Sequence, residues 1–239
     1  MQNGLYVSLS AQVSLERRLE TLANNVANMN TVGFRGEGIH FSTELAKAGD
    51  SPISYVAPGV SYISRDVGSA TKTDNPFDVA IQGDGWMAIK TQSGTAYTRD
   101  GRMRMAESGA LETLIGNPVL DAGAAPIVLN AAGSPPTIGG DGMITQDGRQ
   151  VGAIGLFSID SQANLVRTEN SGVIPDKPAT PILDFTQNGV VQGYVEGANV
   201  NPIDEMTKLI SLTRNFDGVN SEVTQTESSM EDAIKSLAT

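Results

Sequence analysis

The chain has 239 residues, with 27 Asp or Glu against 16 Lys or Arg, so its formal net charge at neutral pH is −11. This acidity argues against binding nucleic acid or anionic lipid through a general basic surface. The sequence has no cysteine and one histidine, His40. These counts exclude disulfides, thiol nucleophiles, Cys-ligated zinc or iron–sulfur centres and clusters of several histidine ligands.

The N-terminal segment has no basic side chain before Arg17 and no long apolar run, which predicts that there is no cleavable secretory signal. No apolar run in the sequence approaches the roughly 18 residues of a membrane span. We therefore expect a chain that is either cytosolic or exported by another route, without direct membrane insertion.

The first 30 residues predict a helix. Their apolar side chains recur at intervals of four and three residues, the spacing of a coiled-coil seam: Leu15, Leu19, Leu22, Val26 and Met29. Because glycine readily adopts the left-handed conformation that ends helices, Gly33 is expected to terminate this one.

Four asparagines lie near the end of this helix, although asparagine is a poor helix former: Asn24, Asn25, Asn28 and Asn30. Asn28 is four residues after Asn24 and three after Asn25, so the three amides share one helix flank. Two interpretations stay open. The amides cap the helix's terminal carbonyls, or they form a row that meets the backbone of a neighbouring subunit, with Phe34 as an apolar plug against the helix.

The middle of the chain contains turn signals that are typical of a β structure. Residues 36–70 are expected to form a linker or arm, and whether this part is strand or extended chain stays open. In residues 71–198 turn signals recur about every 8–12 residues, which predicts a β-rich outer domain. Three dipeptides are typical of two-residue hairpins because they accommodate positive φ angles: Asp100-Gly101, Asp147-Gly148 and Asn188-Gly189.

A second helix is predicted near the C-terminus, with Asn201 as its N-cap and Pro202 as its first residue. Asp204 and Glu205 follow in the first turn, where carboxylates favour the positive end of the helix dipole. Apolar residues then recur at intervals of seven, with mostly polar residues at the intervening positions: Leu209, Phe216, Val223 and Met230. The predicted fold is α+β: residues 1–35 and 199–239 pair as a coiled-coil-like helical domain.

Ordering a backbone costs about 1–2 kcal/mol per residue. Helix hydrogen bonds return about 0.5–1.5 kcal/mol each, and each buried Leu or Phe about 1.5–3 kcal/mol. A narrow seam with polar interruptions leaves little surplus, so we expect the terminal helices to be completed by other copies or related subunits.

One segment matches a nucleotide-binding pattern, since Gly83, Gly85 and Ala88 fit G-x-G-x-x-A. A dinucleotide site of this type needs a helix directly after the glycines. Here only a strand-length segment follows before the next turn, which favours a tight β turn. His40 has no accompanying nucleophile elbow. We therefore predict no enzymatic activity, catalytic residue, cofactor, metal site or small-molecule substrate.

The segment from Ala23 to Arg35 reads Ala-Asn-Asn-x-Ala-Asn-x-x-Thr-x-Gly-Phe-Arg. It resembles the signature of the bacterial flagellar rod and hook proteins. Three further parts resemble the same family: residues 78–86, residues 97–101, and residues 199–206 with 214–216. The resemblance thus spans nearly the whole chain, and within the family it points to a proximal-rod subunit, with a distal-rod or hook subunit as the alternative.

This resemblance implies a structural subunit exported by the flagellar type III apparatus without signal cleavage. It would assemble in the periplasmic rod with itself and related rod proteins, terminal helices inside and β domain outside. The implied axial packing seam is Leu15, Leu19, Leu22 and Val26 with Leu209, Phe216, Val223 and Met230. The implied helix end and inter-subunit hydrogen bonds involve Asn24, Asn25, Asn28, Thr31, Gly33 and Phe34. Two alternatives from other classes are a nucleotide-binding oxidoreductase and a secreted β-rich adhesin with a coiled-coil stalk.

Overall fold

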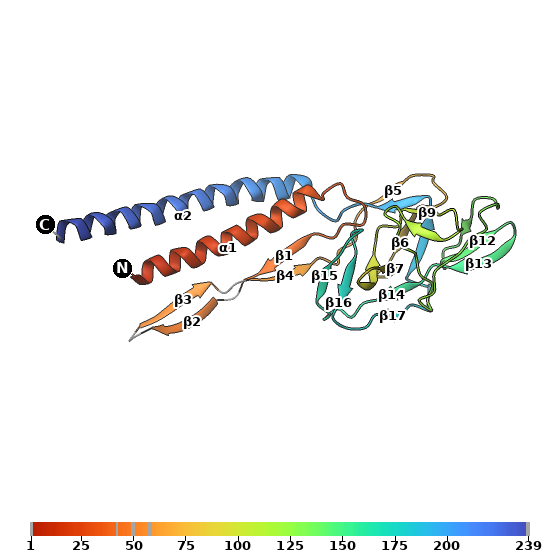
Figure 1. The fold of residues 1–239 in the computed structure, drawn as a ribbon, viewed down its shortest axis with the longest axis horizontal. Coiled ribbons are helices and arrows are strands. Elements are labelled where there is room, and N and C mark those ends of the chain that lie inside the picture. Colours follow the sequence, from red (N-terminus) through yellow and green to blue (C-terminus); the bar gives the residue numbers. More distant parts are fainter. Residues whose placement is uncertain (1, 42, 49–50, 57–58, 238–239) are drawn as a thin grey trace. The chain divides into compact units, whose positions relative to one another are not determined.

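The computed structural model describes residues 2–41, 43–48, 51–56 and 59–237, and the side chains of residues 9–41, 59–225, 228–229 and 235–236. Helices α1 (Gln2–Ala27) and α2 (Pro202–Leu237) flank a strand-rich region in the chain, so the fold is α+β (Figure 1). No helix in the described part combines the length and apolarity needed to cross a membrane.

The chain divides into two compact units. The first, here called the helical unit, comprises residues 1–27, 37–62 and 201–239. The second, the β-rich unit, comprises residues 28–36 and 63–200. Residues 28–36 therefore belong to the β-rich unit although they directly follow α1.

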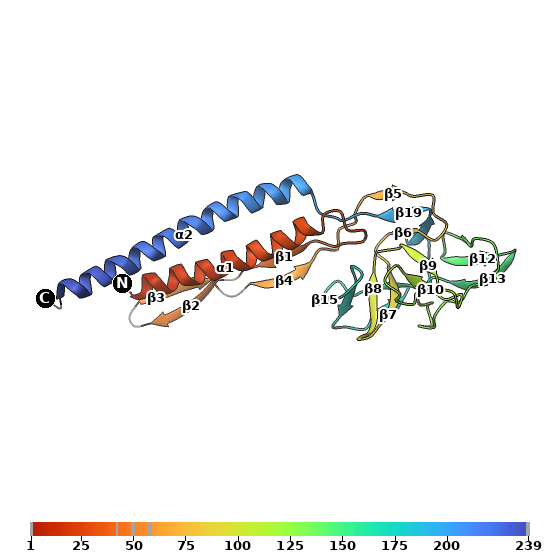
Figure 2. The same ribbon diagram turned by 45° about the horizontal axis from the view of Figure 1, so that its top comes forward.

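In the helical unit, α1 and α2 lie side by side and run in opposite directions (Figures 1 and 2). The arm between residues 36 and 70, for which strand and extended chain were both open, contains strands. β1 (Glu37–His40) pairs with β4 (Val60–Ile63), and β2 (Thr43–Ala48) pairs antiparallel with β3 (Ser51–Val56). The rings of His40 and Tyr62 stack with their centroids 4.3 Å apart.

The β-rich unit is built around a six-stranded sheet in the order β15-β16-β8-β7-β14-β17. Its strands are β7 (Trp86–Thr91), β8 (Gly94–Thr98), β14 (Leu156–Ser158), β15 (Leu165–Arg167), β16 (Val173–Pro175) and β17 (Thr180–Pro181). Smaller ladders join β5 (Ala70–Lys72) to β19 (Tyr194–Glu196), β6 (Val79–Gln82) to β18 (Gly189–Gln192), and β9 (Met103–Met105) to β10 (Leu111–Thr113). A three-stranded sheet contains β11 (Thr137–Ile138), β12 (Met143–Gln146) and β13 (Arg149–Ala153).

The main core of this unit collects aliphatic and methionine side chains from several ladders rather than from one sheet face, among them Val79, Met87, Ile89, Leu111, Ile144 and Leu156. A second cluster surrounds the single tryptophan, Trp86, with Ile63, Ile159, Ala163 and Val173. Strands short enough to be marginal alone are thus held by shared side-chain burial.

One of the three predicted hairpins is confirmed. Asp147 and Gly148 have φ angles of 51° and 75° and connect β12 to β13. The other two predictions are wrong: the strands on either side of Asp100-Gly101 pair elsewhere, and the strand after Asn188 pairs with β6. A turn dipeptide permits a reversal of the chain, but the burial of distant strands decides which partners meet.

The start of α2 is confirmed, because Asn201 Oδ1 accepts a hydrogen bond of 3.1 Å from the Ile203 amide. The end of α1 differs from the prediction. The helix stops at Ala27, before Met29, so Gly33 is not its terminating residue. Gly33 does adopt positive φ, at 68°, but for a contact in the β-rich unit that is described below.

The glycine motif at residues 83–88 is a turn, as predicted. Gly83 has φ of 75° between β6 and β7, and residues 86–91 after it are strand β7. The helix that a dinucleotide site of this type requires is therefore absent from residues 86–91.

Candidate functional site

The two terminal helices turn apolar faces inward in the helical unit. On α1, Leu22 is buried and Leu15, Leu19 and Val26 are half-buried. On α2 the covered residues recur at intervals of three and four: Leu209, Leu212, Phe216, Val219 and Val223. The heptad spacing predicts Thr213 and Asn220 at the intervening positions. The covered residues are instead Leu212 and Val219, each one position earlier in the sequence. The covered face of α2 is therefore more apolar than predicted.

The predicted seam residue Met230 lies outside the described side chains, although the backbone there belongs to α2.

A second apolar face on α2 remains uncovered. Ile203, Met206 and Ile210 are 76%, 42% and 56% exposed, and their spacing of three and four residues places them on one helix face. At about 100° per residue, this face points nearly opposite to Leu212. On α1, Leu9 and Val13 are likewise exposed. The chain therefore covers one apolar face of α2 and presents another.

Asn25 is buried and uses its whole amide inside the helical unit. Its Oδ1 accepts from the Glu37 amide at 2.8 Å, and its Nδ2 donates to the Glu37 carbonyl at 2.9 Å and to Glu205 Oε2 at 3.1 Å. The side-chain amide of Asn25 thus forms two hydrogen bonds with the backbone of Glu37 in β1, and it also bonds Glu205 in α2. These bonds correct the capping interpretation for Asn25, while its expected contact with a neighbouring subunit stays a prediction.

Sequence reasoning missed Glu205, which it explained by the start of α2. This carboxylate is buried, accepts from Asn25 and pairs with Lys208 at 2.7 Å. Asn25 and Glu205 are 180 residues apart, so no local pattern could have indicated their contact.

The other polar residues of the signature behave differently. Asn28 and Thr31 form a local turn, in which the Thr31 amide donates to the Asn28 carbonyl at 2.9 Å and its hydroxyl to Asn28 Oδ1 at 3.2 Å. Phe34 is buried in the β-rich unit, with the Arg167 guanidinium 4.3 Å from the centre of its ring. Asn24 is exposed on α1.

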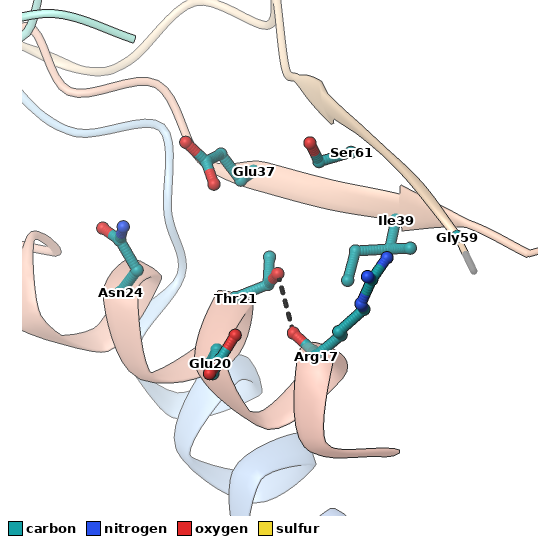
Figure 3. A pocket seen from close by; sticks show the side chains of 8 residues that line it. All are labelled: Arg17, Glu20, Thr21, Asn24, Glu37, Ile39, Gly59 and Ser61. Carbon is teal, nitrogen blue, oxygen red and sulfur yellow. Dashed lines mark hydrogen bonds between the residues drawn. The ribbon is translucent and has the colours of Figure 1, made fainter. Parts of the chain in front are cut away.

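Asn24 lines a pocket of about 340 Å³ in the helical unit, between α1 and the strands β1 and β4. Figure 3 shows Asn24 and Arg17 reaching from α1 toward β1, and Thr21 donates to the Arg17 carbonyl at 3.0 Å. The lining is mostly polar: Arg17, Glu20, Thr21, Asn24, Glu37, Ile39, Gly59 and Ser61. Such a surface suits contact with polar groups of another protein rather than burial of an apolar ligand.

The β-rich unit contains a buried ion cluster. Glu196 binds Arg35 at 2.6 Å and Arg99 at 3.0 Å, and all three side chains are at most 2% exposed. Both guanidinium groups lie near the Trp86 ring, at 5.8 Å and 5.6 Å from its centroid. Burial lowers the pKa of Arg35 to about 10, and the neighbouring Glu196 carboxylate opposes this shift. Burial lowers the pKa of Arg99 in the same way.

Backbone groups complete the cluster. Glu196 Oε1 accepts from the Gly68 amide at 2.8 Å, Arg35 donates to the Asp66 carbonyl, and Arg99 donates to the carbonyls of Ile81 and Gly83. The family-like segments around residues 35, 86 and 99 therefore meet here. Glu196, which lies in none of those segments, is the residue that joins them.

Gly33 lies against this cluster. Its amide donates to the Glu196 carbonyl at 2.7 Å, and a Cβ at this position would lie 2.2 Å from the Asp100 amide nitrogen. Positive φ and backbone contact both require glycine here.

We expect Gly33→Ala to lower the free energy of unfolding of the full chain by about 2–4 kcal/mol, combining left-handed strain with overpacking. Urea unfolding followed by Trp86 fluorescence measures the loss. Gly148→Ala is the matched control, because Gly148 also has positive φ, 75°, but a Cβ there would meet no atom within 4 Å. Equal losses in the two variants would contradict the importance of the Asp100 contact.

Comparison with known proteins agrees with this architecture. The sequence matches three family descriptions: "Flagella basal body rod protein" over residues 5–35, "Flagellar hook protein FlgE/F/G D1 domain" over residues 80–146, and "Flagellar basal body rod FlgEFG protein C-terminal" over residues 191–237. The chain belongs to the family of flagellar basal-body rod and hook proteins.

Its relatives include flagellar basal-body rod proteins FlgF. The protein from Mesorhizobium japonicum is 49% identical and that from Rhizobium meliloti 44% identical, each over 99% of this chain and 98% of the relative. The FlgF protein of Caulobacter vibrioides is 35% identical over the same shares. This similarity supports a structural subunit of the proximal flagellar rod.

Proposed function

We propose that this rod subunit assembles with itself and with related axial proteins of the flagellum through α1 and α2. The observation that supports the proposal most directly is the exposed apolar face of α2, formed by Ile203, Met206 and Ile210. Burying an aliphatic side chain stabilises a complex by about 1.5–3 kcal/mol. A face of three such residues is unfavourable in water and is satisfied by a helix of a neighbouring subunit.

In this proposal the two terminal helices pair within one subunit in a coiled-coil-like manner. The proposed seam is Leu15, Leu19, Leu22 and Val26 on α1 against Leu209, Phe216, Val223 and Met230 on α2, with Leu212 and Val219 added from the structure. The exposed face of α2 then serves contacts between subunits. Asn24, which is exposed on α1 and lines the polar pocket, is one of the residues proposed to contact a neighbouring subunit.

The remaining parts of the proposal follow from the family. The subunit is exported by the flagellar type III apparatus without signal cleavage and assembles in the periplasmic part of the rod. The terminal helices form the inner layer around the export channel, and the β-rich unit supplies lateral contacts outside it. The role is structural rather than enzymatic, like that of its rod-protein relatives.

Complementation tests this function. A strain that lacks the gene is expected to be non-motile, and the full chain supplied in trans is expected to restore swimming and to be detected by antibody in purified hook–basal bodies. Motility without the gene, or basal bodies that lack the chain, would contradict the assignment. A mutant that swims but fails to attach would instead favour the adhesin. Saturable binding of a nicotinamide dinucleotide, followed by Trp86 fluorescence, would favour the oxidoreductase.

A further inference from the structure

Four passages of the chain connect the two units, between residues 27 and 28, 36 and 37, 62 and 63, and 200 and 201. Gly36, Ser64 and Asn199 belong to the β-rich unit, and each lies within two residues of one of these passages. These positions are far apart in the sequence, yet the structure joins them through one side chain.

The side chain is the half-buried amide of Asn199. Its Oδ1 accepts from the Gly36 amide at 2.7 Å, while its Nδ2 donates to Ser64 Oγ at 3.0 Å and to the Asp66 carbonyl at 2.8 Å. One amide therefore bonds both of the other segments at once. The sequence separations are 163, 135 and 133 residues, so this is a tertiary link and not a local turn.

Backbone hydrogen bonds reinforce the same point. The backbone amide of Asn199 donates to the Phe34 carbonyl at 3.2 Å, and the backbone amide of Ser64 donates to the Gly36 carbonyl at 2.7 Å. Arg167 from β15 donates to the Arg35 carbonyl at 2.6 Å. The ion cluster of Arg35, Arg99 and Glu196 continues this network into the β-rich unit.

We propose that Asn199 is the fastening residue of a junction, formed by residues 34–36, 64–66 and 199, at which the β-rich unit holds three of its connections to the helical unit as one body. A force on any one connection is then shared by all three. This suits a subunit that transmits torque, because a single connection would otherwise deform alone. The inference concerns the folded chain itself, and only its motility readout rests on the proposed function.

The chemistry of the amide makes the proposal specific. Asparagine supplies an acceptor for Gly36 and two donor hydrogens for Ser64 and Asp66. Asn199→Asp keeps the acceptor and loses the donors, and Asn199→Ala loses both. The two variants therefore separate the link to Gly36 from the link to residues 64–66.

Hydrogen exchange of the purified full chain tests the junction. In Asn199→Ala, the Gly36 and Ser64 amides are expected to exchange about 10- to 100-fold faster, since the lost side-chain hydrogen bonds leave both segments easier to open. In Asn199→Asp, the Gly36 amide stays close to its wild-type rate and only the Ser64 amide exchanges faster. The Leu111 amide, bonded to the Ile127 carbonyl in the core, is expected not to change in either variant.

Asn164→Ala is the matched control. Asn164 is also in the β-rich unit, and its side-chain amide donates to Asp176 at 2.7 Å rather than to residues 34–36 or 64–66. Unchanged exchange at Gly36 and Ser64 in Asn199→Ala would overturn the proposal, and so would acceleration that includes Leu111 equally, because the residue would then support the unit as a whole.

Cells that carry Asn199→Ala are expected to build flagella but to lose swimming speed more steeply than wild type as the medium becomes more viscous. Equal loss in both strains would overturn the load-sharing role even where the exchange result holds. Failure of the proposed function is distinguishable, because the wild-type chain would then be missing from basal bodies.

Discussion

Replacing Glu196 by glutamine is expected to lower the free energy of unfolding by about 3–5 kcal/mol, the cost of breaking a buried ion pair on one side. The variant keeps the shape of the side chain but removes the carboxylate charge that pairs with both buried arginines, Arg35 and Arg99. The pKa of Arg35, lowered to about 10, shows that burial opposes its charged form. Because the folded chain holds the Arg35 proton less tightly than the unfolded chain does, the free-energy cost of burying the charged Arg35 side chain is fully present at every pH below about 10. It declines only as the pH rises further.

Chemical denaturation of the full chain measures this effect, and Trp86 reports it directly because the ring lies beside both guanidinium groups. Glu112→Gln is the control. Glu112 pairs with Arg104 at 2.8 Å in the same unit, but that arginine is 55% exposed, so a loss of about 0–1 kcal/mol is expected. Similar losses for the two glutamine variants would show that the buried cluster does not need its carboxylate charge.

Replacing Ile210 by lysine is expected to abolish swimming while the subunit still folds. Ile210 is exposed on α2, so its replacement changes the free energy of unfolding by no more than about 0.5 kcal/mol. In a rod the same residue would be buried against a neighbour. Losing about 1.5–3 kcal/mol at each copy of the contact weakens association about 10- to 100-fold per interface. The charge of the lysine adds a desolvation cost.

Motility of a complemented deletion strain and the content of its basal bodies measure the outcome. Ser211→Lys is the matched control, because Ser211 is also exposed but points about 100° away from Ile210 around the helix. It introduces the same charge off the apolar face and should leave swimming near the wild-type level. If both lysine variants swim equally well, the exposed face of α2 is not an assembly surface.

Local chemistry made parts of this fold predictable. The Asn201-Pro202 start of α2, the turn at Asp147-Gly148 and the strand after Gly85 each depend on residues a few positions apart. The inward face of α2 was predicted only in part, because an interval of seven residues can be divided into four then three or into three then four. The burial of Leu212 and Val219 shows that the packing uses three residues first and then four.

For residues of the signature segment 23–35, by contrast, the tertiary structure decided which groups they contact. Gly33 looked like a helix terminator, yet its positive φ serves a close contact with the Asp100 backbone. Asn25 looked like part of a row facing outward, yet it is buried and bonded to Glu37 and Glu205. In both cases the residue type was informative about backbone geometry or hydrogen-bonding capacity, but not about the partner.

The amino-acid sequence by itself determined the helical ends, the β-rich middle, the absence of cysteine chemistry and the family resemblance, since periodicity, capping and composition act over a few neighbouring residues. Only the tertiary structure decided that Glu196 joins Arg35 to Arg99, that Glu205 receives Asn25, and that Asn199 gathers three segments. These partners are far apart along the chain. Their contacts exist because burying charged and polar groups is tolerated only where the folded chain brings complementary groups together.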